Sequence, residues 1–228
     1  KLIKLIGEEK EEKKEEIFKA LKLPKEFTSI INNSDISARH ALSYLKRRGL
    51  TIEDIKKYNI GFCPNGSYAN MVIIPSYDKD GSLNYFTGRS FEKDPFIKYR
   101  NPECSRDIIP FELFINWDSP LVLCEGPFDA IAIKRNAIPL LGKNIQSNLL
   151  KRIVQSTVKK IYIALDTDAI KQALKHCEYL LNQGKEVYLV ELDGKDPSDL
   201  GFSYFTKLIQ NTEPIDQYDL MEKKISLV

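Results

Sequence analysis

Carboxylates follow three apolar segments in the second half of the sequence, each of which ends abruptly at an acidic residue or an acidic turn. If these acids meet in the fold with no basic partner among them, their charges repel and raise one another's pKa values unless divalent cations are bound. Oxygen ligands without histidine or cysteine suit Mg²⁺ or Mn²⁺ and not Zn²⁺. The apolar segments are Leu121–Cys124, Lys160–Leu165 and Glu186–Leu192, and the acids are Glu125, Asp129, Asp166, Asp168, Asp196 and Asp199.

Such a cluster predicts phosphoryl transfer, because two divalent ions held roughly 4 Å apart are the usual arrangement for in-line displacement at phosphorus. Glu125, on the separate first segment, could instead stay protonated and act as a general acid or base. The alternative is helix capping, since Asp129, Asp168 and Asp199 each lie near a predicted helix start, where a carboxylate is favourable. Capping would explain any one of these three aspartates, whereas the whole set favours a metal site.

Basic residues lie close to the acids in the sequence. The segment 130–165 contains seven lysines and arginines and no acid. These cations could hold a polyanion beside the metal site, or they could lie on ordinary solvated helix faces. Lys143, which follows Gly142 at a strand end, could likewise contact a phosphate or be a surface lysine.

A second basic group precedes the acids and is mixed with aromatic residues. Arg89, Lys98 and Arg100 lie in segments that also carry Phe86 and Tyr99. Cations beside aromatic rings suit a single-stranded nucleic acid, whose backbone is held by charge and whose bases stack. The alternative is that the aromatic residues are ordinary strand residues.

The composition limits the class of protein. The chain has 228 residues, of which 43% are hydrophobic and 29% charged, as in globular proteins. Neither a membrane span nor a signal peptide is expected, which favours a cytoplasmic setting. The four cysteines are scattered, so we expect no zinc site. The first residue, Lys1, suggests a fragment or a processed product.

The first half of the chain is predicted to combine helices with a small antiparallel sheet. A charged helix over Ile6–Leu23 is expected to stop at Pro24. The next two helices form either a DNA-binding helix-turn-helix or, as we favour, a core-forming hairpin. The first helix is expected to begin with Ser37 as its cap and to end at Gly49, and the second helix, Ile52–Tyr58, is expected to be capped by Thr51. The expected strands are Met71–Pro75 and Leu83–Arg89, joined by a turn at Tyr77–Gly81.

The second half alternates strands with helices, which predicts a parallel sheet with helices on its faces and a ligand site beyond the carboxyl ends of its strands. The predicted fold class is therefore α/β, with an α+β N-terminal subdomain. The expected units are a helical extension (1–36), a basic α+β subdomain (37–118), a catalytic domain (119–202) and C-terminal helices (203–228). The expected elements are strands 121–124, 138–141, 160–165 and 186–192 and helices 109–114, 128–135, 147–156, 169–182, 199–210 and 214–224.

Three acidic motifs carry a resemblance to a known family. Glu125-Gly-Pro-Phe-Asp129, Asp166-Thr-Asp168 and Gly194-Lys-Asp196-Pro-Ser-Asp199 resemble the signatures of the Toprim domain of DnaG-type primases, topoisomerases and certain nucleases. Shorter upstream motifs follow in the order of the DnaG-type primase catalytic core, and the likeness is greatest to the compact primases of phages. These motifs are Asn59–Phe62, Val72–Pro75, Asp80–Gly81, Gly88–Arg89, Lys98–Asn101 and Pro110–Phe114, and the resemblance covers residues 37–201.

The resemblance implies template-directed synthesis of short RNA primers on single-stranded DNA during replication, with ribonucleoside triphosphates as substrates and two or more Mg²⁺ or Mn²⁺ ions. By this resemblance Glu125 is the catalytic glutamate and Asp129 and Asp199 are supporting acids. A replicative helicase and a zinc-ribbon domain or subunit are implied partners. The metal-binding acids would be Asp166, Asp168 and Asp196, and the basic residues for template and nucleotide would be Arg89, Lys98 and Arg100.

Several features differ from the family pattern and keep other functions open. Neither the usual zinc ribbon nor a helicase-binding domain is present in the sequence, Thr167 stands where glycine is common, and one extra residue separates Pro197 from Asp199. A Toprim nuclease would use the same acids with water as the nucleophile. A third interpretation is a binding subunit that is inactive without a zinc-ribbon partner, whereas a topoisomerase is disfavoured because there is no room for the domain with its tyrosine.

Overall fold

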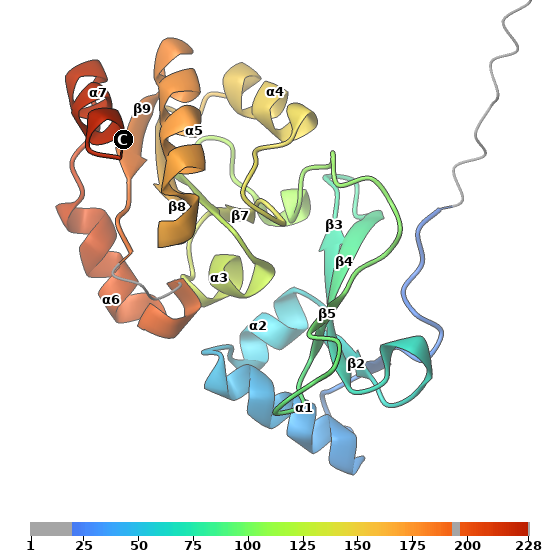
Figure 1. Cartoon of the computed structure of the whole chain (residues 1–228). Coiled ribbons are helices and arrows are strands. Elements are labelled where there is room, and N and C mark those ends of the chain that lie inside the picture. Colours follow the sequence, from blue (N-terminus) through green and yellow to red (C-terminus); the bar gives the residue numbers. More distant parts are fainter. Residues whose placement is uncertain (1–19, 193–196, 228) are drawn as a thin grey trace, which may run out of the picture.

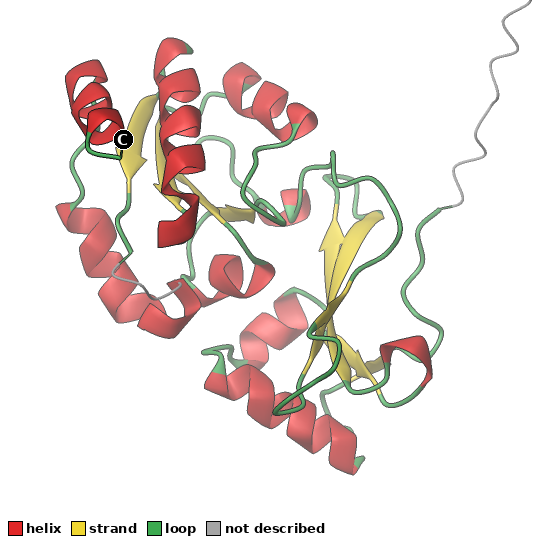
Figure 2. Cartoon of the chain, in the orientation of Figure 1, coloured by secondary structure: helices red, strands yellow, loops and turns green. Residues whose placement is uncertain are grey.

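The computed structural model describes residues 20–192 and 197–227 of the chain. Two sheets organise these residues, a five-stranded antiparallel sheet in the first half and a four-stranded parallel sheet in the second. Helices cover the parallel sheet on both faces, and two further helices pack beside the antiparallel sheet (Figures 1 and 2). The predicted α/β class, with an α+β first half, is confirmed.

The antiparallel sheet is a meander in which each strand pairs with the next along the chain. Alternate residues of β3 enter different cores, because Val72 and Ile74 face the main core and Met71 and Ile73 face a smaller one. The predicted turn between β3 and β4 is confirmed, with Gly81 at φ 82°. The strands are β1 (Thr28–Ser29), β2 (Gly61–Cys63), β3 (Met71–Tyr77), β4 (Leu83–Ser90) and β5 (Tyr99–Arg100), with a short 3-10 helix, η1 (Gly66–Tyr68), after β2.

The two helices of this half are α1 (Ile36–Arg47) and α2 (Ile52–Lys57). Ser37 was the wrong cap for α1, because the Asp35 carboxylate takes that place and accepts a hydrogen bond from Ser37 N at 2.7 Å. The predicted capping by Thr51 is confirmed, and Gly49 ends α1 with φ 78°. Both helices bury apolar residues in the main core, as the hairpin interpretation predicts.

The predicted N-terminal helix lies mostly outside the described residues. Its last four residues, Ala20–Leu23, are described and are not helical. The prediction of a helix continuing to Pro24 was therefore wrong at that end, where Leu21 and Leu23 instead pack against the smaller core of the antiparallel sheet.

The parallel sheet has the strand order β7-β6-β8-β9. Each neighbouring pair is parallel, as the alternation of strands and helices predicts. The strands are β6 (Leu121–Cys124), β7 (Ala137–Pro139), β8 (Lys160–Ala164) and β9 (Glu186–Leu189), and the helices are α3 (Pro127–Ala132), α4 (Ser147–Gln155), α5 (Ile170–Asn182), α6 (Pro197–Asn211) and α7 (Gln217–Ile225), with short 3-10 helices η2 (Glu112–Phe114) and η3 (Thr167–Ala169).

Element boundaries differ from the predictions where tertiary contacts intervene. Helix α7 begins at Gln217 instead of Pro214, because Pro214 forms a β-bridge with Tyr188 and Asp216 caps the helix. Helix α6 is kinked at Gly201, whose φ of 74° is left-handed. Helix α3 is short, since Lys134 adopts φ 50° soon after its end.

The two faces of the parallel sheet belong to different cores. Val122, Cys124 and Ala164 belong to the main core, together with apolar residues of α3 and α6 and of α1, α2, β2 and β3 from the first half of the chain. The alternate residues Leu121 and Leu123 face α4, α5 and α7. One core is thus shared by both halves of the molecule, and burial of this shared apolar surface fixes the antiparallel sheet relative to the strand ends of the parallel sheet.

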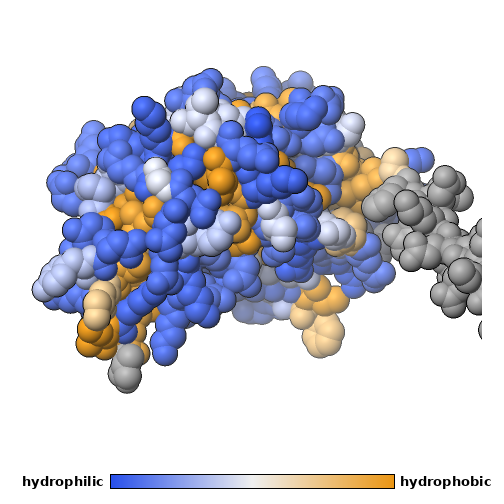
Figure 3. Space-filling model, turned by 90° about the horizontal axis from the view of Figure 1, so that it is seen from above, coloured by the Kyte–Doolittle hydropathy of each residue, from blue (hydrophilic) through white to orange (hydrophobic). Residues whose placement is uncertain are grey.

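In the described part of the chain, every helix is too short or too polar to span a bilayer. From above, the surface is largely hydrophilic, and its apolar side chains form separate patches (Figure 3).

Asp54 provides a test of the contact between α2 and α3. Its Oδ2 accepts hydrogen bonds from Thr51 N at 2.7 Å and Thr51 Oγ1 at 2.8 Å, and the same atom pairs with the Lys134 ammonium. Because Asp54→Ala removes the second member of the capping box at Thr51 and the partner of the Lys134 ammonium, we expect a loss of about 2 kcal/mol of unfolding free energy, measured by urea denaturation. Asp80→Ala, which breaks an exposed pair with Lys79, is the control and should leave the midpoint unchanged. Equal stability of Asp54→Ala and wild type would contradict this account.

Candidate active site

The strand order creates a point where the chain changes direction across the sheet. From β6 the chain passes to β7 on one side, and later returns to place β8 on the other side of β6. Strands β6 and β8 are therefore neighbours with their carboxyl ends together. Glu125 follows β6 directly, and Asp166 follows β8 after one further residue. Ligands of open α/β sheets bind in the crevice at such a point.

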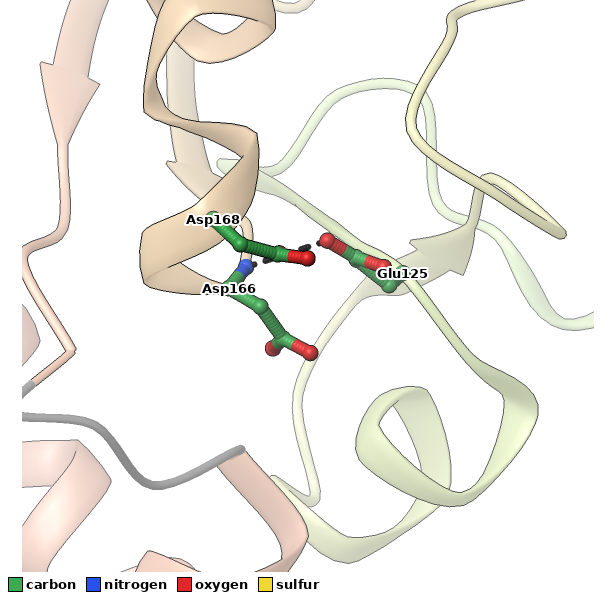
Figure 4. Close-up of side chains that lie close together, drawn as sticks. All are labelled: Glu125, Asp166 and Asp168. Carbon is green, nitrogen blue, oxygen red and sulfur yellow. Dashed lines mark hydrogen bonds between the residues drawn. The ribbon is translucent and has the colours of Figure 1, made fainter.

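Three of the predicted acids meet there. One carboxylate oxygen each from Glu125, Asp166 and Asp168 lies within 4.8 Å of the others. Asp166 N donates to Glu125 Oε1 at 3.2 Å, which ties the two strand ends together. In Figure 4 the carboxylates of Glu125 and Asp168 point toward each other, and that of Asp166 lies beside them. Asp166 precedes η3 and Asp168 lies within it, so this short helix sets their spacing.

The electrostatics of the cluster favour a bound cation. Burial raises the pKa of Glu125 above its ordinary value, and the Asp166 charge adds to this, while the hydrogen bond from Asp166 N acts in the opposite direction. The side chain of Asp168 is 72% exposed and accepts a hydrogen bond from Lys143 Nζ at 2.6 Å. Three converging carboxylates with oxygen donors only, one of them partly desolvated, fit Mg²⁺ or Mn²⁺.

Asp129 occupies a different position from these three residues. It is 7% exposed, and its Oδ2 accepts from Gly126 N at 3.1 Å at the start of α3. Its Oδ1 accepts from Ser198 N at 3.3 Å. A Cβ at Gly126 would lie 3.0 Å from Asp129 Oδ2, so glycine gives this turn its room. Asp129 thus joins the turn after β6 to the start of α6.

The remaining predicted acids belong to the third motif. Asp199 pairs with Arg48 Nη1 at 3.1 Å, away from the cluster of three acids. Asp196 lies outside the described residues.

The predicted template residues line the antiparallel sheet. Arg89 of β4 is paired with Tyr99 of β5, and its guanidinium carbon lies 4.3 Å from the centroid of the Tyr99 ring. The Nε of Arg89 donates a hydrogen bond to Tyr44 Oη at 3.1 Å. Arg100 lies 5.9 Å from the ring centroid of Tyr68. Lys98 is exposed in the loop before β5. Arg89 and Tyr99 share one face of the β4–β5 pair, whereas Arg100, the next residue of β5, lies with Gly88 and Tyr68 on the other face. The structure therefore places Arg89 and Arg100 on opposite faces of the sheet.

The sequence analysis did not identify residues that connect the two halves beside the site. Arg48 Nη2 donates to Ser198 Oγ at 2.7 Å, and its guanidinium lies 5.4 Å from the Phe128 ring. The Tyr44 ring packs edge-on against Phe128 with centroids 6.0 Å apart. Tyr44 and Arg48 lie at the end of α1, about 150 residues before Ser198, so no local pattern could indicate this contact.

Comparison with known proteins agrees with this geometry. Residues 122–200 match the Toprim-like family. Over 185 residues the chain is 32% identical to the uncharacterized protein MG010 of Mycoplasma genitalium, with 74% of this chain and 83% of that protein covered. It is 25% identical to a DNA primase of Legionella pneumophila over 82% of this chain.

The chain belongs to the Toprim proteins that are homologous to DnaG-type primase catalytic cores. It spans 42% of the Legionella primase. Its fold is also similar to that of a DnaG primase catalytic domain bound to single-stranded DNA, with a TM-score of 0.66, 22% identity, and 79% of this chain and 74% of that chain covered. None of the relatives named above is described as a phage primase, so the particular likeness to phage primases stays a prediction.

The raised pKa of Glu125 predicts how this Toprim site affects stability. A carboxyl whose pKa is higher in the folded state stabilises the fold while protonated, and this contribution is lost as the pH rises through the folded pKa. Without divalent ions, Glu125→Gln should therefore melt at a higher temperature than wild type near neutral pH, and the difference should vanish well below pH 4.5, the ordinary pKa.

Adding Mn²⁺ should raise the melting temperature of the wild type more than that of Glu125→Gln, since the ion stabilises only a state that binds it. Melting curves over a range of pH, with and without Mn²⁺, test both statements. A destabilised Glu125→Gln at neutral pH without metal would contradict the electrostatic account.

Proposed function

We propose that this chain is a primase catalytic core, a nucleotidyltransferase that makes short RNA primers on single-stranded DNA from ribonucleoside triphosphates. The observation that carries the proposal is the convergence of Glu125, Asp166 and Asp168 within 4.8 Å at the sheet edge. The homology to primase cores supports the same activity. The chain covers less than half of the Legionella primase, so the activity and the partners of this chain are proposals.

In the proposed reaction the 3′-hydroxyl of one nucleotide attacks the α-phosphate of the next, and pyrophosphate leaves. Asp166 and Asp168, with Asp196 predicted beside them, would hold Mg²⁺ or Mn²⁺, and Asp129 and Asp199 would support them. Bound divalent ions supply positive charge for the phosphate oxygens and the leaving pyrophosphate.

The other groups of the site have separate proposed roles. Glu125, whose raised pKa brings it nearer to the working pH, is suited to accept or donate a proton at the reacting oxygen. Lys143 would contact a phosphate of the incoming nucleotide. Asp129 would keep the Glu125 turn in place through its hydrogen bonds to Gly126 N and Ser198 N.

The template is proposed to lie along β4 and β5 at the edge of the antiparallel sheet, where Arg89 and Arg100 lie on opposite faces. Arg89, Lys98 and Arg100 would contact its phosphates, and Tyr99, which is 49% exposed, offers a ring for a base. The DnaG primase domain of similar fold binds single-stranded DNA, which supports this role. A zinc-ribbon domain or subunit and a replicative helicase are proposed partners.

Primer synthesis tests the proposed activity. Purified protein with single-stranded DNA, ribonucleotides and Mn²⁺ should make short RNA, and Glu125→Gln should lower the rate by about 100-fold or more, since it removes the proposed acid or base. Asp80→Asn, which removes a carboxylate from the β3–β4 turn, is the control and should retain the wild-type rate. Inactivity of the wild type, even with a zinc-ribbon partner added, would contradict the proposal, and cleavage of nucleic acid without nucleotides would favour the Toprim nuclease.

Binding of single-stranded DNA tests the proposed template surface. Arg89→Ala should weaken binding several-fold and reduce the slope of log K against log salt by about 0.7, the value for one lost phosphate contact on a single strand. Tyr44→Phe removes the hydrogen bond to Arg89 but keeps the cation, so it should leave the salt slope unchanged. The measurement is fluorescence anisotropy with a labelled oligonucleotide at several salt concentrations. An unchanged slope for Arg89→Ala would exclude Arg89 from the phosphate contacts.

A further inference from the structure

A lysine side chain reaches into the acidic cluster from the loop after β7. Lys143 Nζ donates to Asp168 Oδ2 at 2.6 Å, and Asp168 is one of the three acids whose oxygens converge. Glu125, Asp166 and Asp168 are all acidic, so the Lys143 ammonium offsets part of the negative charge that a divalent ion would also offset. Lys143 is thus a counter-ion inside the site where a divalent ion is expected.

The backbone before Lys143 holds an uncommon shape. Leu141 has φ 56° and Gly142 has φ 147°, both outside the range that residues with a side chain usually adopt. Gly142 N donates to the Glu125 carbonyl at 3.4 Å, and Arg106 Nη1 donates to the Leu141 carbonyl at 3.4 Å. The loop is therefore attached to the Glu125 turn, and its left-handed residues direct Lys143 toward the acids.

The other side of the loop is attached to α5. His176 Nε2 lies 3.0 Å from the Lys143 carbonyl oxygen, at hydrogen-bond distance. The amide of Gln172 donates to Asn144 Oδ1 at 3.0 Å. Contacts on both sides fix the Lys143 backbone, while its four-carbon side chain, 40% exposed, keeps room to move the ammonium. The loop thus has a fixed base and a movable cation.

We propose that Lys143 is the resident counter-ion of the metal site and that a divalent ion binding at Asp168 displaces its ammonium. The two cations use the same carboxylate, so they compete. This inference rests on the proposed function, because it takes the three acids as the metal site. The displaced ammonium becomes available to a nucleotide phosphate, which couples metal loading to substrate contact.

Metal affinity measured without catalysis tests the competition. Free Mn²⁺ is followed by electron paramagnetic resonance during titration of the wild type and Lys143→Met. Removal of a competing cation should tighten Mn²⁺ binding by about tenfold at low ionic strength, and salt should reduce this difference because it screens the charge. Lys143→Gln should behave as Lys143→Met does, and provides a second neutral variant if the first does not fold.

Two controls separate competition from a general loss of charge. Lys171→Met removes an exposed lysine from α5, near but outside the acidic cluster, and should leave Mn²⁺ affinity close to that of the wild type. Lys143→Arg keeps the cation and should also remain close to it. Tighter binding by the neutral Lys143 variants alone would support the proposal.

Two results would overturn the proposal, and they have different consequences for the metal site and the proposed primase activity. If wild type and both neutral variants bind Mn²⁺ equally well, or the variants bind it more weakly, Lys143 does not compete and the metal site itself remains. If no protein binds Mn²⁺, the metal site and with it the proposed primase activity fail together.

Discussion

The pairing of β6 with β8 is the constraint on which the site depends. These strands are distant in the sequence but adjacent and parallel in the sheet, with Cys124 opposite Ala164 in register. That register brings the residue after one strand and the residues after the other to a common edge. The hydrogen bond from Asp166 N to Glu125 Oε1 stabilises the approach of two carboxylates that otherwise repel each other.

The shared core transmits this arrangement to the first half of the chain. Val122 and Cys124 of β6 pack in the same cluster as Ile55 of α2 and Ile74 of β3. The polar contacts of Arg48 with Ser198 and Asp199 lie at the border of this core. Asp129, which accepts from Gly126 N and Ser198 N, connects that border to the turn that carries Glu125. The position of the acids relative to the basic sheet is therefore set by packing on one face of the parallel sheet.

The charged partners of the basic residues in segment 130–165 distinguish Lys143 from several others. Lys134 pairs with Asp54, and Arg152 lies 3.8 Å from Glu112. Of the seven cations in segment 130–165, Lys143 is the one shown in contact with the acidic cluster. Lys160 lies at the opposite end of the sheet beside Glu186. Lys134, Arg152 and Lys160 therefore have acidic partners outside the cluster.

The sequence by itself determined the parallel sheet, the carboxylates at its strand ends and the hairpin of the first half, because these follow from local patterns of apolar residues, turns and caps. It gave Asp129 a supporting role at a helix start, but it did not identify the groups that this carboxylate contacts. Only the tertiary structure decided that Asp129 faces Gly126 and Ser198, that Arg48 holds the start of α6, and that Lys143 lies against Asp168. These contacts join residues far apart in the chain, and their partners are set by strand order and by packing of the shared core, which a local sequence pattern does not contain.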